Sequence, residues 1–201
     1  MRELGEKESL DFLEKFGFKI VERAFFLTRF GLKSSLRKVG IDSIMKISGK
    51  NFPKEVSKKT ASNFKTYTGA LEDFKNLKKI KGLRGVLLKK KVKGKEFFVT
   101  VKRNGTPNPF LSFSSLELNE ENQKGIPSKS FPITKAILEK MIKEAKFPKT
   151  FSMKLRKNFE EFVMKLCQFF QENSSIKSIE ISSLFVNEKS LIVVNARIIS
   201  E

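Results

Sequence analysis

The stretch from residue 179 to residue 200, IEISSLFVNEKSLIVVNARIIS, decides the fold expected of this chain. It holds two apolar runs rich in valine and isoleucine, residues 179–186 and 191–199, joined by a short polar segment. Such a pattern is typical of an antiparallel hairpin. Both runs are nearly continuous in apolar residues, which predicts that both faces of the hairpin are covered. The polar residues that interrupt them are the first candidates for a functional site: Glu180, Ser182, Ser183 and Asn195.

These polar residues stand in two short motifs, EISSL at 180–184 and NARI at 195–198. Together the motifs resemble the metal-binding end of the ATP-grasp fold, in the β-subunit type of the NDP-forming acyl-CoA synthetases, relatives of succinyl-CoA synthetase. That family carries Glu-Ile-Asn-Pro-Leu, a turn, and a strand ending in Asp-Ala-Arg-Ile. The resemblance implies that Glu180, Ser182 and Asn195 occupy magnesium-binding positions, with Ser182 and Asn195 in place of the family's Asn and Asp.

The resemblance extends over almost the whole chain and implies an α+β, two-lobed ATP-grasp-like fold with mainly antiparallel sheets. We expect a single domain over residues 1–201, with approximate lobes at 18–83 and 84–201. Apolar residues at helical spacing predict helices over 6–16, 30–39, 71–80 and 152–173, and a further helix starting near residue 134. Strands are predicted at 18–26, 41–48, 64–68 and 110–116. The runs 84–92 and 95–103 are predicted to form a second hairpin that turns at Gly94.

A nucleotide site follows from the same resemblance. In the family, a strand lysine reaches the nucleotide phosphates, and Lys46 matches it. The retained loop lysine is Lys58, the strand leading to the adenine-binding hinge contains Leu88 and Lys89, and the acid after a turn glycine is Glu96. From the residues alone, Lys46 lies in an apolar run, which favours an anion contact; the alternative is an edge-strand lysine whose ammonium reaches solvent.

Several departures from the family predict that the chain is degenerate and does not catalyse by itself. The family's loop His-Lys-Ser-Asp-x-Gly-Gly-Val corresponds to SKKTASNF at 57–64, with Ser57 at the position of the His implied in phosphoryl relay. The chain contains no histidine at all, which removes the commonest general acid and base. Phosphoryl transfer depends on a metal ion, and hard dications require carboxylates. The implied cofactors are ATP or ADP and Mg²⁺, and these departures predict weak binding of the metal.

The charge of the chain points to a polyanionic partner. Lys and Arg number 41 against 22 Asp and Glu, a formal net charge of +19. Such a field attracts RNA or DNA, and a ribonucleoprotein such as the ribosome is the expected partner. The alternative is a solvated lysine-rich surface shaped by the codon usage of an AT-rich genome. The candidate polyanion contacts are Lys50, Lys54, Lys58, Lys59, Lys89, Lys90, Lys91, Lys93, Lys95, Lys102 and Arg103.

Three functional hypotheses remain open from the sequence. The first is a degenerate, non-catalytic ATP-grasp-like protein that binds RNA or a ribonucleoprotein through its basic surface. The second is a nucleotide-binding β-type subunit of an ADP-forming acid–CoA ligase, active only with a partner chain such as an α-type subunit. The third is a regulatory subunit that pairs with a paralogous β-type subunit. The lack of a long apolar run and the acidic N-terminal stretch predict a cytoplasmic location without a membrane partner.

The single cysteine, Cys167, cannot form a disulfide within the chain. It lies beside the apolar stripe of the helix predicted over 152–173, and no histidine is available to activate it as a nucleophile. We therefore expect Cys167 to be a small residue in the core or at its boundary.

Overall fold

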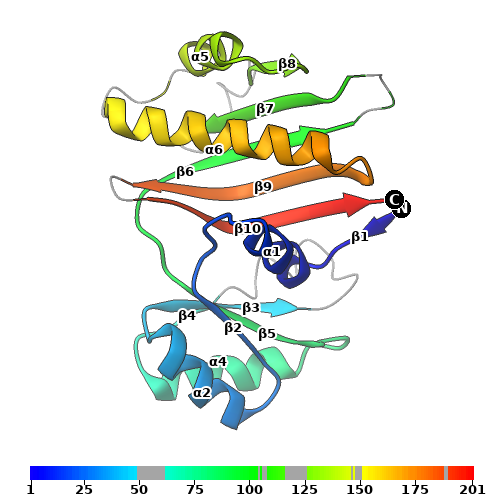
Figure 1. Ribbon diagram of the computed structural model, residues 1–201. Helices are drawn as coiled ribbons and strands as arrows, with labels where there is room; N and C mark the ends of the chain where they lie inside the picture. The colour runs from blue at the N-terminus through cyan, green and yellow to red at the C-terminus, as the bar shows by residue number, and fades with distance from the viewer. Residues whose placement is uncertain are drawn as a thin grey trace. The chain divides into compact units, whose positions relative to one another are not determined.

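The computed structural model describes residues 1–48, 62–103, 105, 108–115, 126–145, 147, 151–187 and 190–201. They form two compact units (Figure 1). Unit 1 consists of Met1–Ile20 and Lys93–Glu201, and unit 2 consists of Val21–Val92. The expectation of a single domain with approximate lobes at 18–83 and 84–201 stays a prediction.

Unit 1 is built on an antiparallel sheet that has six strands among the residues described. Helix α6 (Met153–Glu172) packs on the sheet at β9 and β10, and α1 (Glu6–Lys15) packs against β10, while α5 (Lys135–Glu144) packs against α6 (Figure 1). The order of strands across the sheet is β1 (Arg2–Glu3), β10 (Ser190–Ser200), β9 (Ile176–Asn187), β6 (Lys95–Lys102), β7 (Phe110–Ser115) and β8 (Ser128–Ser130).

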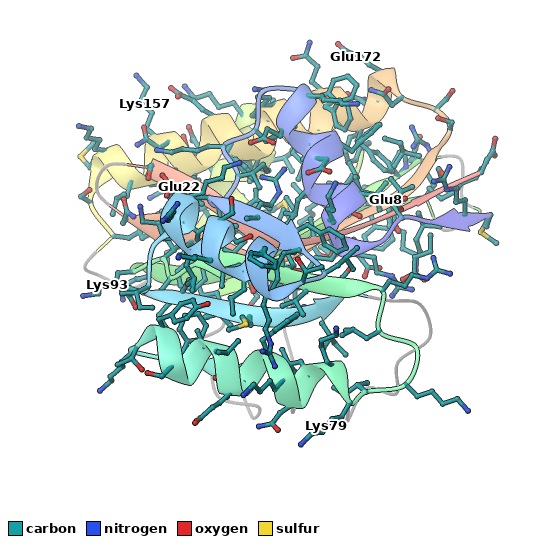
Figure 2. The ribbon with its side chains drawn as sticks, turned by 90° about the horizontal axis from the view of Figure 1, so that it is seen from below. Glu8, Glu22, Lys79, Lys93, Lys157 and Glu172 are labelled. Carbon is teal, nitrogen blue, oxygen red and sulfur yellow. The ribbon has the colours of Figure 1, made fainter. Side chains whose placement is uncertain are left out.

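The hairpin predicted at 179–199 and the helix predicted at 152–173 are both confirmed. Strands β9 and β10 pair antiparallel from Ser190 opposite Asn187 to Ser200 opposite Ile176. Helix α6 begins after Ser152, whose hydroxyl accepts a hydrogen bond from the backbone N–H of Leu155 at 3.3 Å. Its apolar stripe is buried, and charged side chains on its other side, Lys157 and Glu172 among them, point outward (Figure 2).

The core of unit 1 is rich in phenylalanine. The ring of Phe159 on α6 lies 5.3 Å from that of Phe97 on β6 and 5.2 Å from that of Phe113 on β7. Phe147 completes the cluster at 5.1 Å from Phe159. Burial of these large side chains between helix and sheet supplies much of the stabilisation of unit 1. The face of the sheet that carries Phe97 and Phe113 is therefore its core face.

Unit 2 has a smaller sheet in the order β2 (Arg23–Phe26), β5 (Gly85–Lys90), β3 (Ser43–Ser48) and β4 (Ser62–Asn63). Helices α2 (Arg29–Val39) and α4 (Tyr67–Lys78) contribute their buried residues to the core on one face of this sheet. That core includes Phe26, Met45 and Leu88 from the strands and Leu32 and Phe74 from the helices.

The hairpin predicted for 84–92 and 95–103 is wrong. β5 pairs with β2 and β3 in unit 2, whereas β6 pairs with β7 and β9 in unit 1. Gly94 has a φ of +150°, and a Cβ on it would lie 2.7 Å from the carbonyl oxygen of Val186 on β9. The glycine is thus required by a close approach to β9 rather than by a hairpin turn. Each run was a sound strand prediction, but the two runs belong to different sheets.

Two other boundaries also differ from the prediction. The strand predicted at 18–26 begins only at Arg23, although Phe18 and Val21 before it are buried. The strand predicted at 64–68 is absent, because Thr66 caps the N-terminus of α4 and its hydroxyl accepts a hydrogen bond from Gly69 N–H at 3.1 Å. A threonine in this position ends an extended segment and starts a helix. The helix therefore begins at Tyr67 instead of residue 71.

Cys167 is expected to resist alkylation in the folded protein. Its side chain is buried on α6, and this burial raises the pKa of the thiol from 9.0 to about 12. The unfolded chain ionises first as the pH rises, so the thiol's contribution to the free energy of unfolding is complete below pH 9.0 and is lost towards pH 12. Iodoacetamide should react slowly with native protein near pH 9.0 and rapidly in denaturant. Equal rates in both states would contradict the burial.

Across the described ranges, no helix is both long and apolar enough to cross a membrane.

Candidate functional site

In unit 2, three cationic side chains share the face of the sheet opposite the helices. Arg23 on β2 lies directly opposite Lys89 on β5, and Lys89 lies directly opposite Ile44 on β3. Lys46 is two residues further along β3 and is therefore a diagonal neighbour of Lys89. Opposed residues have Cβ atoms about 5 Å apart and diagonal neighbours about 7–8 Å apart. We call Arg23, Lys46 and Lys89 the cationic face of unit 2.

The lysines of the cationic face are not ordinary surface residues. Lys89 is only 4% exposed, and Lys46 is half-buried. Each makes an interaction within the protein, so neither is without a partner. β3 lies between β5 and β4, and among the described residues β4 pairs only with Ile44 and Met45, so Lys46 is paired with β5 alone. Arg23, Lys46 and Lys89 thus gather positive charge on one face of the sheet, and such charge favours an anion there.

Leu88 lies on the other face of the same strand. Its side chain is fully buried in the core formed with α2 and α4. Alternation along β5 separates it from Lys89, so the structure does not place the two side chains together. Conversely, Arg23 was not identified from the sequence. The signal that could have found it is a basic residue in a short apolar strand, but its position opposite Lys89 depends on strand pairing.

In unit 1, a polar row crosses the sheet on the face opposite the phenylalanine core. Ser112 on β7 lies opposite Thr100 on β6, Thr100 opposite Glu180 on β9, and Glu180 opposite Arg197 on β10. Hydroxyl, carboxylate and guanidinium groups therefore alternate with the apolar residues of the core face along each strand. We call this surface, together with Ser182 and Asn195, the polar face of unit 1.

The hairpin is irregular at the candidate metal positions. Ser182 and Ser183 on β9 together oppose the single residue Phe98 on β6, and a further register shift separates Val193 from Asn195 on β10. These β-bulges place Asn195 opposite Ser183, and Asn195 Nδ2 donates a hydrogen bond to Ser183 Oγ at 2.9 Å. Ser182 remains exposed beside this pair. Bulges re-aim side chains and are frequent next to functional sites.

Glu180, the carboxylate of this group, faces a cation from the same chain. Arg197 Nη1 lies 3.9 Å from Glu180 Oε2, and Arg197 Nη2 donates a hydrogen bond to Glu3 Oε2 on β1 at 2.6 Å. The hydrogen bond with Glu3 raises the pKa of Arg197, and the charges of Glu3 and Glu180 act in the same direction. The guanidinium therefore ties β1, β9 and β10 together through two carboxylates.

The residues at the metal positions do not fit a magnesium ion. Mg²⁺ prefers octahedral oxygen coordination that includes one or two carboxylates. Here Ser182 and Asn195 are neutral, and Glu180 is the one carboxylate among the three positions. No cluster of three or more His, Cys, Asp or Glu residues able to hold a metal occurs in the parts of the chain that the structure describes.

Two buried hydroxyl groups on the polar face lack a hydrogen-bond partner within the described part of the chain. They are Thr100 Oγ1, beside Glu180, and Ser178 Oγ, two residues before Glu180 on β9. A buried hydroxyl without a partner costs free energy, and such groups in native proteins are often satisfied by a ligand or water. Neither residue was identified from the sequence, because serine and threonine in a strand carry no distinctive signal.

The remaining predicted residues are dispersed. Glu96 lies on β6 opposite Phe185, and Lys50, Lys54, Lys58 and Lys59 fall outside the described residues. Lys93, Lys95 and Lys102 belong to unit 1, where Lys93 and Lys102 are exposed.

Several of the cations predicted to bind polyanions have partners in the fold. Lys90 forms an ion pair with Glu22 at 2.8 Å, and Lys91 forms one with Asp42 at 3.3 Å. The Arg103 guanidinium lies 4.1 Å from the ring centre of Phe170 and donates hydrogen bonds to the carbonyl oxygens of Phe170 and Ile176. Burial there lowers the pKa of Arg103. The polyanion set stays a prediction, and its members are divided between the two units.

The sequence of this chain matches a known protein family. A family model described as an ATP-grasp domain matches residues 1–199. The chain belongs to the ATP-grasp family. The resemblance inferred from the hairpin motifs and the expected α+β fold with antiparallel sheets are thereby confirmed.

This ATP-grasp chain is similar in sequence to an ADP-forming acetate–CoA ligase and in fold to several solved structures. It is 26% identical over 98% of its length to the acetate–CoA ligase (ADP-forming) II of Archaeoglobus fulgidus, and it spans about 30% of that protein. It superposes on Ca. Korarchaeum cryptofilum ACD1 in complex with coenzyme A with a TM-score of 0.84 at 17% identity, covering 100% of this chain and 94% of that one. The chain also superposes on PH1788 of Pyrococcus horikoshii with a TM-score of 0.84 at 19% identity, covering 99% of this chain and 92% of that one.

The comparisons therefore favour the ligase-type alternative over the first hypothesis. The chain is similar to ADP-forming acyl-CoA synthetases, and nothing in the comparisons supports RNA binding or a loss of catalysis. The RNA hypothesis rested on net charge alone. A positive net charge indicates attraction to polyanions but does not specify which partner binds.

Proposed function

We propose that this ATP-grasp chain is the nucleotide-binding β-type part of an ADP-forming acid–CoA ligase and that it requires a partner chain for turnover. The observation that carries the proposal is the cationic face of unit 2, in a chain whose residues 1–199 match the ATP-grasp family. The cytoplasmic location expected from the sequence belongs to the same proposal.

The chain's own residues would bind and orient the phosphates. Lys46 and Lys89 supply charge-assisted hydrogen bonds to phosphate oxygens, and Arg23 beside Lys89 adds a planar guanidinium that can bind two oxygens at once. Because these groups are held on paired strands, they are pre-organised and lose little entropy on binding. Phosphate positioning of this kind is a major part of phosphoryl-transfer catalysis.

A partner is needed because the chain lacks the remaining chemistry. It contains no histidine to accept a phosphoryl group. It spans about 30% of the length of the curated ligase. An α-type subunit that carries a phosphoryl-accepting histidine and the site for CoA and the acid would complete the reaction.

ATP binding and turnover by the purified chain test this proposal. Isothermal titration should show saturable ATP binding. A coupled ADP-release assay with ATP, acetate and CoA should show no turnover by the chain alone. Failure to bind ATP would overturn the proposal, and sustained ADP formation by the pure chain would overturn the requirement for a partner.

A further inference from the structure

We propose that the hairpin positions 180, 182 and 195 of this chain hold no divalent cation and that magnesium does not strengthen its binding of ATP. The inference rests on the proposed function and specifies that the chain takes ATP without a metal at these positions. Two observations carry it: the neutral donors of the hairpin and the cation beside its one carboxylate.

The donor set is too weakly charged to hold a hard dication. The exposed Ser182 offers a hydroxyl and Asn195 an amide, and neither carries a negative charge. The hydrogen bond that Asn195 Nδ2 donates to Ser183 Oγ at 2.9 Å orients the amide, and the amide oxygen is a neutral ligand. Dehydrating Mg²⁺ is costly, and neutral side-chain oxygens repay that cost poorly compared with carboxylates.

The one carboxylate of the set already has a cation beside it. Arg197 Nη1 lies 3.9 Å from Glu180 Oε2, and its guanidinium is fixed by the 2.6 Å hydrogen bond to Glu3. A dication bound to Glu180 would lie close to this positive charge. The repulsion between them opposes metal binding even at the high effective dielectric of a protein surface.

The polar face can instead contact a ligand through a hydrogen bond alone. Ser182 is exposed, and its hydroxyl can donate a proton to a ligand oxygen without a metal bridge. Magnesium should therefore leave the ATP affinity of the chain unchanged.

The test is titration of the full chain with ATP in EDTA and in excess magnesium chloride, at matched ionic strength because surface electrostatics are screened by salt. We expect the affinity in EDTA to equal that in magnesium. A gain of about tenfold or more on adding magnesium, the size typical of a functional metal contact, would overturn the inference and leave the proposed function intact. No ATP binding in either buffer would overturn the proposed function, and the inference with it.

A variant should restore the metal site. Ser182→Asn combined with Asn195→Asp recreates the family's donors, and we expect magnesium to raise its ATP affinity by about tenfold or more. Ser182→Asp alone, at an exposed position, should change the metal response in the same direction without disturbing packing. Mn²⁺ binding followed by electron paramagnetic resonance gives a readout independent of nucleotide. Mn²⁺ should bind the double variant and not the wild type.

Asn76→Asp is the matched control. Asn76 is exposed on α4, and its side-chain oxygen accepts a hydrogen bond from Lys79 Nζ at 3.1 Å. The substitution adds the same single negative charge as Asn195→Asp, away from the hairpin. It should leave the magnesium response at the wild-type level. If the control responds like the double variant, or if the double variant binds no Mn²⁺, the assignment of these positions as a lost metal site is overturned.

Discussion

Methionine in place of Lys46 should weaken ATP binding by about 10- to 100-fold, the equivalent of losing one hydrogen bond to a charged group. Lys46 lies inside the β-sheet of unit 2, diagonal to Lys89 and on the face that the helices leave uncovered. Methionine keeps the length and apolar stem of lysine and removes only the ammonium, so packing against the neighbouring Leu87 should be retained. Isothermal titration of ATP gives the dissociation constant directly.

The control for Lys46 is Lys75→Met. Lys75 is exposed on α4, whose buried residues pack on the opposite face of the same sheet. The Lys75→Met substitution removes an equal charge. It should change the ATP affinity by less than about threefold, because an exposed charge beyond the Debye length is screened. Equal losses of ATP affinity in the two variants would mean that ATP binding depends only on the net charge of the chain. Unchanged affinity for Lys46→Met, with an unchanged melting temperature, would remove Lys46 from the site.

Alanine in place of Phe159 should lower the free energy of unfolding by about 3–5 kcal/mol, the usual cost of deleting a fully buried phenylalanine. Phe159 is 0% exposed, and its ring lies within 5.3 Å of the rings of Phe97, Phe113 and Phe147. The deletion leaves a cavity that surrounding rings on rigid strands cannot close. Urea denaturation followed by far-ultraviolet circular dichroism measures the change.

Phe30→Ala is the control for Phe159, since Phe30 is 88% exposed and should change stability by no more than about 0.5 kcal/mol. Phe159→Leu should give a smaller loss than alanine, because it retains part of the buried volume. It also keeps the test decisive if the alanine variant does not fold. A loss below about 1 kcal/mol for Phe159→Ala would show that the phenylalanine cluster is not the core of unit 1.

The fold of this chain depends on the alternation of apolar residues in β9 and β10 and on the apolar stripe of α6. Ser182 is exposed and Asn195 is half-buried, so neither belongs to the buried core that supports this frame. Function resides in side chains carried by the fold and can diverge without altering it.

The local pattern of apolar residues was sufficient to predict much of the secondary structure of this protein. The alternation of apolar residues predicted the hairpin at 179–199, and the helical spacing of apolar residues predicted α1, α2 and α6 to within one residue at each end. These predictions succeed because the periodicity of a sequence states which side of an element is buried, and burial decides whether the element is stable. The same hairpin also retained enough of its family's motif to identify the fold.

Only the tertiary structure decided which strands pair and which side chains meet. Runs 84–92 and 95–103 look alike from the sequence, yet their strands lie in different sheets. Arg23 meets Lys89 across 66 residues of chain, and Arg197 reaches Glu3 across 194 residues. The bulges that bring Asn195 to Ser183 shift the register of a hairpin whose existence was predicted. The physical reason is that apolar periodicity determines which side of a strand is buried but not which strand pairs with it. The neighbouring strand is selected by the packing of the whole unit.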